Sequence, residues 1–211
     1  MAKYQELADS ILTGNNVRSK EITQDLVGKG IDPAEILNGG LIAGMEVVGR
    51  KFKANEMYIP EVLIAARAMH AAMDILKPLL SEAGASSKGT AVIGTVQGDL
   101  HDIGKNLVSM MLEGAGFNVV DLGVDISPEK FVEAVNSSKA DILGLSALLT
   151  TTMPAMKEII DEVRKDGSAK SVKIIVGGAP VTQEYADSIG ADGYAADAST
   201  AVEVSEKLLT V

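Results

Sequence analysis

The sequence predicts an α/β protein in two parts: a four-helix bundle, then a flavodoxin-like or Rossmann-like sheet of five parallel strands with helices on both faces. Apolar residues recur at helical spacing from residue 4 to about 80, and a small, polar stretch follows at 81–89. Beyond it, short apolar runs alternate with helical segments. We therefore expect a helical domain over residues 1–87 and an α/β domain over residues 88–211.

The N-terminal part is expected to contain helices at roughly 3–13, 16–28, 33–53 and 60–80. One boundary between them is well marked. Gly30 ends a helix, and the run Asp32-Pro33-Ala34-Glu35 begins the next with a capping residue, proline at the first helical position and glutamate three residues after the cap. Ile31 and Ile36 are spaced for a hydrophobic staple across this helix start.

The stretch Ser81–Gly89 has the composition of a linker, and the domain boundary is expected there. After it, strands are expected at Thr90–Val96, Asn118–Leu122, Ile142–Ser146, Val172–Val176 and Gly193–Ala195, and helices near 103–115, 128–138, 154–166, 182–189 and 199–209. The first four strands are apolar on both faces, which is typical of a parallel, doubly wound sheet. Ligands of such sheets lie beyond the carboxyl ends of the strands, and in the flavodoxin-like order the strand order reverses between strands one and three.

The composition argues against several classes of function. The formal net charge is −10, and no cluster of Lys and Arg interrupts the acidic balance, so nucleic acid is not an expected partner. The chain has no Cys and its N-terminus has no apolar signal core, which together predict a cytoplasmic protein. No apolar run reaches the length of a bilayer span, so membrane insertion is not expected.

The run from Gly98 to Asn106 places one histidine, His101, among carboxylates in a glycine-flanked turn after the first strand. The one other histidine, His70, lies in a predicted helix and is most simply a surface or packed residue, so a zinc site of His/Cys type would be short of ligands. A lone imidazole suffices where a macrocycle supplies the other donors. Asp99 is the favoured partner for the second ring nitrogen, and Asp102 more plausibly caps the following helix. The alternative is a strand-to-helix turn whose aspartates only cap that helix.

Two further motifs fall at carboxyl ends of strands. Gly177 and Gly178 follow the fourth strand, where the absence of a Cβ would let a ligand approach the backbone, although turns after strands are often rich in glycine. Ser146 and the run Thr150–Thr152 follow the third strand and could bind a ligand through hydrogen bonds. Thr152 is also well placed to cap the helix that begins near Pro154, and for this residue capping is the favoured interpretation.

Together these motifs resemble the vitamin B12-binding fold of corrinoid proteins, with its Asp-x-His-x-x-Gly, Ser-x-Leu and Gly-Gly signature. All three parts are present in order, at 99–104, 146–148 and 177–178. The helical part, from Lys53 to Met69, is similar to the helical cap domain of methionine synthase and of small methyl-carrying corrinoid proteins. The resemblance thus covers nearly the whole chain.

The resemblance implies that His101 is the lower axial ligand of cobalt in a cobalamin or related corrinoid, bound base-off with histidine on. Asp99 would be its partner, and Thr152 would stand where methionine synthase has the serine that completes a proton relay. The nucleotide tail of the cofactor would lie along the Ser-x-Leu and Gly-Gly segments. The implied cofactor-binding residues are Gly98, Asp99, His101, Asp102, Ile103, Gly104, Ser146, Leu148, Thr150, Gly177, Gly178, Tyr194, Met57, Tyr58 and Val62. For Met57, Tyr58 and Val62, which would cover the upper corrin face, packing within the helical bundle is the alternative.

The function expected from this resemblance is that of a corrinoid protein in a multicomponent methyltransferase system. It would accept a methyl group on cobalt through a donor-specific methyltransferase and pass it to an acceptor such as tetrahydrofolate or coenzyme M through an acceptor-side methyltransferase. A reductive activase is a third possible partner. The alternatives are a corrinoid-sensing regulator, the small subunit of a B12-dependent mutase, and a receiver-like signalling domain. The sequence does not distinguish methylamine, methanol, betaine or aryl methyl ether donors.

Overall fold

The computed structural model describes residues 2–82, 87–167 and 171–210. The chain divides into two compact units, one of residues 1–87 with 114–116 and the other of residues 88–113 with 117–211. Each unit is described below by itself.

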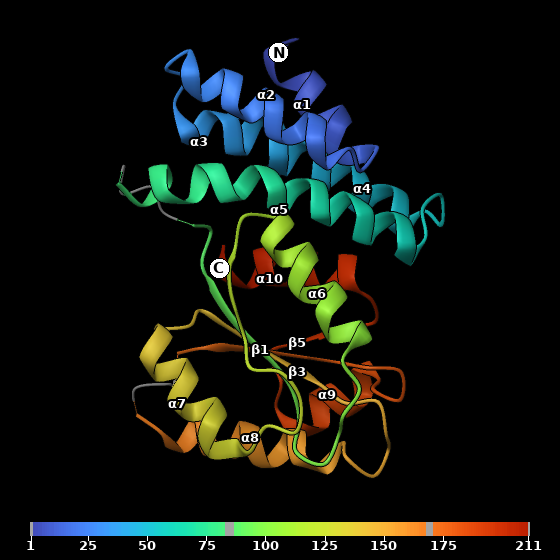
Figure 1. Ribbon diagram of the computed structural model, residues 1–211. Helices are drawn as coiled ribbons and strands as arrows, with labels where there is room; N and C mark the ends of the chain where they lie inside the picture. Colours follow the sequence, from blue (N-terminus) through green and yellow to red (C-terminus); the bar gives the residue numbers. More distant parts are fainter. Residues whose placement is uncertain (1, 83–86, 168–170, 211) are drawn as a thin grey trace. The chain divides into compact units, whose positions relative to one another are not determined.

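The first unit is helical (Figure 1). Its elements are α1 (Ala2–Leu12), α2 (Asn16–Gly28), α3 (Pro33–Ile36), the π-helical segment η1 (Leu37–Ile42), α4 (Ala43–Lys53) and α5 (Ile59–Glu82). The predicted start of α3 is confirmed: the Asp32 carboxylate accepts a hydrogen bond from Ala34 N–H at 2.9 Å, and Pro33 is the first helical residue. Gly30, after the end of α2, has φ +73°, a conformation that glycine adopts without strain.

The prediction of one regular helix over 33–53 is wrong in its middle, because η1 interrupts the α-helical hydrogen bonding there. Gly39 and Gly40 lie in η1 against α1. A Cβ at Gly39 would lie 2.7 Å from Tyr4, and one at Gly40 would lie 2.6 Å from Leu7. The two glycines therefore let the backbones approach closely, which apolar spacing alone does not reveal. At the other end of the unit, α5 continues to Glu82, into the predicted linker, whose residues 83–86 lie outside the described part of the chain.

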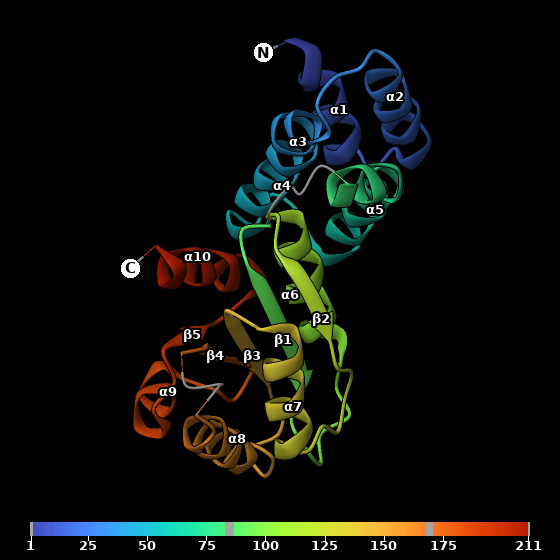
Figure 2. The same ribbon diagram turned by 90° about the vertical axis from the view of Figure 1, so that its left-hand side faces the viewer.

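The second unit is built on a parallel sheet of five strands in the order β2-β1-β3-β4-β5 (Figures 1 and 2). The strands are β1 (Thr90–Thr95), β2 (Asn118–Asp121), β3 (Ile142–Ser146), β4 (Lys173–Gly177) and β5 (Gly193–Ala195). The helices are α6 (Ile103–Gly114), α7 (Pro128–Ser138), α8 (Pro154–Lys165), α9 (Gln183–Ile189) and α10 (Ala198–Leu209). The fold class is confirmed, and β1 and β3 are adjacent, as the flavodoxin-like order requires.

The helices cover the sheet on two faces. The views in Figures 1 and 2 show α7, α8 and α9 on one face and α6 and α10 on the other. The α7–α9 face buries a hydrophobic core that includes Phe131, Leu143, Met156 and Ile174, each 0% exposed. The expectation that the second strand is apolar on both faces is wrong. Asn118 and Asp121 at its ends are exposed, because β2 is an edge strand.

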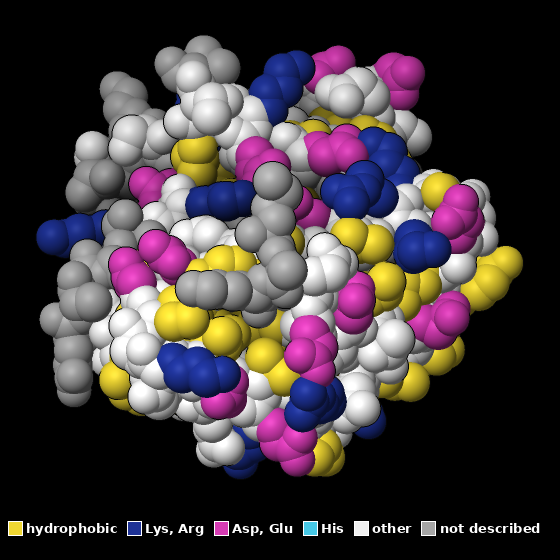
Figure 3. All heavy atoms as spheres, turned by 90° about the horizontal axis from the view of Figure 1, so that it is seen from above, with side chains coloured by type: hydrophobic (Ala, Val, Ile, Leu, Met, Phe, Trp, Pro, Cys, Tyr) yellow, Lys and Arg dark blue, Asp and Glu magenta, His cyan; other side chains and the backbone are white. Residues whose placement is uncertain are grey.

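Among the described residues, no helix has the length and apolarity needed to cross a bilayer. On the face shown in Figure 3, acidic and basic side chains are interspersed.

Candidate functional site

The candidate site lies at the carboxyl edge of the sheet, in the loops that follow β1 and β3. The first loop carries Asp99 and His101 and leads into α6, and the second runs from Ala147 to Met153 and leads into α8. The Asp99 side chain is fully buried, whereas 51% of the His101 side chain is exposed. The carboxylate is thus a fixed internal group, and the imidazole is accessible.

Asp99 joins the two loops through both carboxylate oxygens. Its Oδ1 lies 2.7 Å from His101 Nδ1 and accepts from His101 N–H at 3.1 Å. Its Oδ2 accepts from Leu148 N–H at 2.8 Å and from Leu149 N–H at 3.3 Å. The Thr152 hydroxyl also lies 2.8 Å from Oδ2. One buried carboxylate therefore positions the histidine and closes the loop after β3 around itself.

These hydrogen bonds determine the charge of Asp99 and the tautomer of His101. Burial raises the pKa of the Asp99 carboxyl, but the bonds from Leu148 N–H, the His101 ring, Thr152 and His101 N–H together hold it well below its ordinary value. An ionised carboxylate only accepts hydrogen bonds, so His101 Nδ1 must carry the proton that points at Oδ1. The lone pair of a neutral His101 ring is then on Nε2, the atom available to a metal.

Thr152 does not cap α8. The N-cap position of this helix is Met153, with no side-chain cap bond, and Thr152 Oγ1 lies between Asp99 Oδ2 at 2.8 Å and Leu149 O at 2.9 Å. The capping interpretation is therefore wrong: the buried hydroxyl is a neighbour of the Asp99–His101 pair, placed there by the turn that precedes the helix.

The other predicted residues of the first loop lie around His101. Gly98 has φ +82° and donates its N–H to Asp125 Oδ1 at 2.7 Å. Asp102 precedes α6, and its carboxylate accepts from the Asn106 side-chain amide at 3.1 Å. Gly104 is exposed, with no atom within 4 Å of the position that a Cβ would occupy.

Ser146 and Gly177 lie side by side at the carboxyl edge. The strand register aligns Thr95 with Ser146, Ser146 with Gly177, and Gly177 with Ala195. Since side chains alternate along a strand, this row lies on the α6 and α10 face, opposite the core that contains Leu145. The row holds small side chains only: Thr95, Ser146, Gly177 and Ala195.

Steric contacts within the protein require glycine at positions 177 and 178. A Cβ at Gly177 would lie 2.8 Å from the carbonyl oxygen of Ala195. At Gly178, which has φ +132°, it would lie 1.8 Å from the carbonyl oxygen of Ala147. The two glycines are therefore needed for the backbone of the site itself to pack, whatever they also offer to a ligand.

Apolar side chains are exposed around the histidine. Leu100 and Ile103 are 71% and 73% exposed, and Leu148 and Leu149 are 41% and 42% exposed. Within the described part of the second unit, these four are all of the large hydrophobic side chains that are exposed. Their gathering around one half-exposed imidazole is the arrangement expected of a binding surface for a flat, largely apolar ligand. Thr150, in the same loop as Leu148, is also exposed.

The remaining predicted residues lie in other elements of the two units. Tyr194 lies in β5 and packs, partly buried, against the core of the α7–α9 face. Met57 and Val62 belong to the helical unit and are buried, at 7% and 0% exposure, whereas Tyr58 is 65% exposed. His70, also in the helical unit, is an exposed residue of α5.

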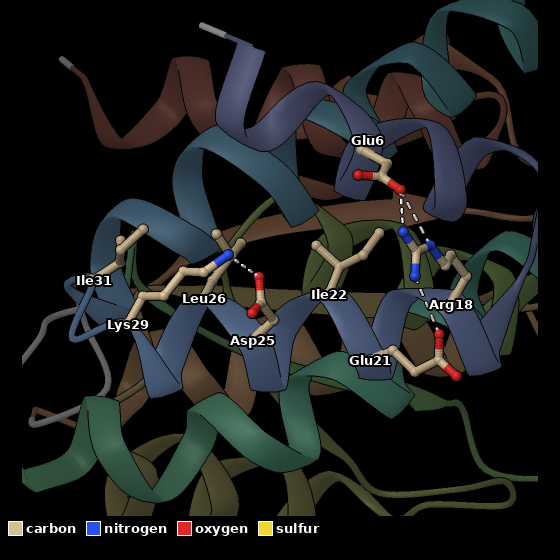
Figure 4. Close-up of a pocket in the computed structure, with 8 residues that line it drawn as sticks. All are labelled: Glu6, Arg18, Glu21, Ile22, Asp25, Leu26, Lys29 and Ile31. Atoms are coloured by element: carbon tan, nitrogen blue, oxygen red, sulfur yellow. Dashed lines mark hydrogen bonds and ion pairs between the residues drawn. The ribbon is translucent and has the colours of Figure 1, made fainter.

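The helical unit has a pocket of about 430 Å³ between α1, α2 and the loop that follows α2 (Figure 4). Its lining residues are Glu6, Arg18, Glu21, Ile22, Asp25, Leu26, Lys29 and Ile31. The charged side chains pair with one another: Arg18 with Glu6 and Glu21, and Lys29 with Asp25. Three carboxylates thus face two cations, so most of the charge is paired and the pocket offers no strong charge to a ligand.

Three contributors to the site could not be anticipated from local sequence patterns. Leu149 offers its backbone N–H to Asp99, and Asp125 binds the backbone of the loop before His101. Thr95, a fully buried strand residue, donates its hydroxyl to His101 O at 2.9 Å. For Asp125 the one available signal is its position just past the carboxyl end of the second strand.

Known proteins share both halves of this chain. Residues 89–203 match the family model of a B12 binding domain, and residues 4–77 match a second model with the same description. The dimethylamine corrinoid protein 1 of Methanosarcina acetivorans is 46% identical over 206 residues, which cover 97% of this chain and 96% of that protein. The trimethylamine corrinoid protein of Methanosarcina barkeri is 43% identical, with 100% of both chains covered.

A solved structure shows the same fold. A chain of the methanol:cobalamin methyltransferase complex from Methanosarcina barkeri superposes with a TM-score of 0.88 at 32% identity, over 99% of this chain and 80% of that one. Sequence, fold and the loop around His101 thus agree: the chain belongs to the family of cobalamin-binding corrinoid proteins of methyltransferase systems.

Proposed function

We propose that this protein carries a methyl group on a bound corrinoid, with His101 as the lower axial ligand of cobalt in the base-off, histidine-on state. It accepts the methyl group from a donor through one partner methyltransferase and passes it to an acceptor such as tetrahydrofolate or coenzyme M through another. The observation that carries this proposal is the accessible His101 ring, fixed by the fully buried Asp99 and surrounded by exposed apolar side chains.

The donor set fits such a cofactor. In the residues that the structure describes, no group of three or more His, Cys, Asp or Glu side chains could hold a bare metal ion. A single imidazole suits a metal whose other ligands come from a macrocycle. Leu100, Ile103, Leu148 and Leu149 would support the lower face of the ring, and the open space at Gly104 would let it approach α6.

The α6 and α10 face of the sheet fits the nucleotide tail. The row that runs from Thr95 through Ser146 and Gly177 to Ala195 presents only small side chains to this face of the sheet. The two helices that cover this face each carry a buried hydroxyl without a hydrogen-bond partner among the described residues, at Ser109 and Ser199. Buried hydroxyls are normally satisfied, so both are available to a polar group of the tail.

When bound, the cobalt supplies the atom that accepts the methyl group and releases it. The chain controls the axial donor beneath that atom. Asp99 keeps the proton on His101 Nδ1 and thereby leaves Nε2 as the donor atom. Thr152, whose hydroxyl lies 2.8 Å from Asp99 Oδ2, would hold the carboxylate in the orientation that keeps this proton in place.

Methylated amines are the donor class that we propose. The relatives named for dimethylamine and trimethylamine are 46% and 43% identical, whereas the chain of the methanol complex is 32% identical. The partners proposed are therefore a methylamine-specific methyltransferase, an acceptor-side methyltransferase and a reductive activase that restores the cofactor. We further propose that residues 1–87 act as the cap domain and that Met57, Tyr58 and Val62 shield the methyl-carrying face.

Histidine variants test this proposal. The purified protein is incubated with hydroxocobalamin and desalted, and its visible spectrum is recorded beside those of His101→Ala and His70→Ala. We expect the wild type and the His70→Ala control to retain corrinoid with a base-off, histidine-ligated spectrum, and His101→Ala to lose or alter it. Equal spectra for both variants would refute the assignment of His101, and absence of retained corrinoid in the wild type would refute the function.

A further inference from the structure

The segment Asp121–Asp125, between β2 and α7, contacts the His101 loop from one side. We infer that this segment, anchored by the ion pair of Lys105 with Asp121, is a positioning device that fixes the backbone around His101. The inference rests on the proposed role of His101 as a cobalt ligand. It assigns a function to Lys105, Asp121 and Asp125, which lie outside the three signature motifs.

The first anchor is the ion pair itself. Lys105 lies in the first turn of α6, and 3% of its side chain is exposed. Its ammonium pairs with Asp121 Oδ2 and donates to Asn106 Oδ1 at 2.6 Å. Asn106 in turn donates to Asp102 Oδ2 at 3.1 Å. The chain of contacts therefore runs from the end of β2 to the residue immediately after His101.

The second anchor reaches His101 itself through β1. Asp121 Oδ1 accepts from Gly123 N–H at 2.8 Å, and Gly123 O accepts from Thr95 N–H at 3.0 Å. Thr95 then donates its hydroxyl to His101 O at 2.9 Å. Asp121 is thus the point at which both sets of contacts meet, one through Lys105 and one through Gly123.

The third anchor holds the backbone before His101. Asp125 Oδ1 accepts from Gly98 N–H at 2.7 Å, and Asp125 N–H donates to Asp99 O at 3.1 Å. Asp125 has φ +55°, a left-handed conformation that Asp and Asn tolerate better than most residues. The reciprocal pair of bonds fixes the peptide next to the carboxylate that orients the histidine.

These anchors make the burial of a lysine in the site energetically tolerable. Burying an ammonium is costly unless it is paired and hydrogen-bonded, and both conditions are met by Asp121 and Asn106. Asp99 holds the imidazole ring and the His101 N–H, whereas the anchors hold the His101 carbonyl oxygen and the neighbouring peptides. A small shift of that backbone would move Nε2 away from an axial bonding distance, so the segment controls the strength of histidine ligation.

Lys105→Met tests the inference, because methionine fills the space of the lysine chain without its charge. Lys157→Met is the matched control: Lys157 forms an ion pair with Asp161 on the surface of α8, and its side chain is 46% exposed. At the third anchor, Asp125→Gly retains the backbone conformation and removes the carboxylate, while Asp125→Asn retains an oxygen that can accept from Gly98. The Asn variant is therefore the conservative rescue.

The readout is the electron paramagnetic resonance spectrum of the cobalt(II) form of the protein loaded with cobinamide, a corrinoid without a nucleotide base. An axial nitrogen that splits each cobalt hyperfine line into a triplet then comes from the protein. We expect Lys105→Met and Asp125→Gly to lose most of the nitrogen triplet and to bind corrinoid about tenfold more weakly. Asp125→Asn and Lys157→Met should keep both properties. Thermal unfolding of the corrinoid-free proteins is recorded in parallel, to measure stability separately.

The outcomes separate the inference from the proposed function. A wild type without the nitrogen triplet would refute histidine ligation itself. A wild type with the triplet, beside Lys105→Met and Asp125→Gly variants that keep it in full while losing only thermal stability, would refute the positioning role and leave a structural one. Loss of the triplet in the Lys157→Met control would likewise count against it, because that pair does not touch the His101 loop.

Discussion

The geometry of the site makes its sharpest prediction for the effect of the substitution Asp99→Asn on stability and corrinoid binding. Both carboxylate oxygens accept hydrogen bonds, Oδ1 from His101 and Oδ2 from Leu148 N–H, Leu149 N–H and Thr152. Asparagine has the same shape, but one of its two terminal atoms is a donor. In either orientation, the Nδ2 group of the amide, which is a donor, therefore faces groups that are themselves donors.

The two orientations fail in different ways. If Nδ2 faces the loop after β3, the N–H groups of Leu148 and Leu149 lose their acceptor. Two bonds to a charged group contribute about 3–6 kcal/mol together, and we expect the free energy of unfolding to fall by an amount in this range. If Nδ2 faces His101 instead, Nδ1 must become the acceptor and the proton moves to Nε2, so the ring can no longer donate to a metal. Corrinoid affinity should then fall about 10–100-fold.

The assay combines urea unfolding of the corrinoid-free protein with the retention and visible spectrum of hydroxocobalamin after desalting. Asp161→Asn, at an exposed position of α8, is the matched control and should change neither quantity. An Asp99→Asn protein that unfolds within about 0.5 kcal/mol of the wild type and retains corrinoid with an unchanged spectrum would contradict both parts of the reasoning.

Three further outcomes follow from the structure. Thr152→Val removes the hydroxyl that lies 2.8 Å from Asp99 Oδ2 and should weaken corrinoid retention up to about tenfold, whereas Thr152→Ser should preserve it. Gly178→Ala places a Cβ 1.8 Å from the carbonyl oxygen of Ala147 and should lower the unfolding free energy in urea by at least about 2 kcal/mol; Gly104→Ala, with open space around it, should stay within about 1 kcal/mol of the wild type. Because the folded-state pKa of Asp99 lies below that of the unfolded chain, its stabilisation is complete above that unfolded value, about 3.9, and is lost as the pH falls further. Wild-type stability should therefore decrease more steeply than that of Asp99→Asn in acid titrations followed by circular dichroism, and parallel curves would exclude this contribution.

Several features of this protein follow from the sequence because their causes are local. The Asp32 cap with Pro33 marks a helix start through contacts between residues two positions apart. The strands β3 and β5 begin and end where the apolar runs predict, and the alternation of strands with helices requires a parallel sheet. The Asp-x-His-x-x-Gly run also identifies Asp99 as a candidate partner of His101, since two residues of spacing bring the side chains together.

Only the tertiary structure decided the role of Thr152, the π-helical turn and the exposure of β2. The contacts that decide these features join distant parts of the chain. Asp99 meets Leu148 across 49 positions and Thr152 across 53, so the threonine that sequence spacing favours as a cap instead binds a carboxylate. The π-helical turn at 37–42 depends on how closely α1 packs, and the exposure of β2 depends on its place at the sheet edge. Hydrogen bonds and steric contacts act over a few ångströms in space. Sequence patterns reveal such contacts only where the two partners are also a few residues apart along the chain.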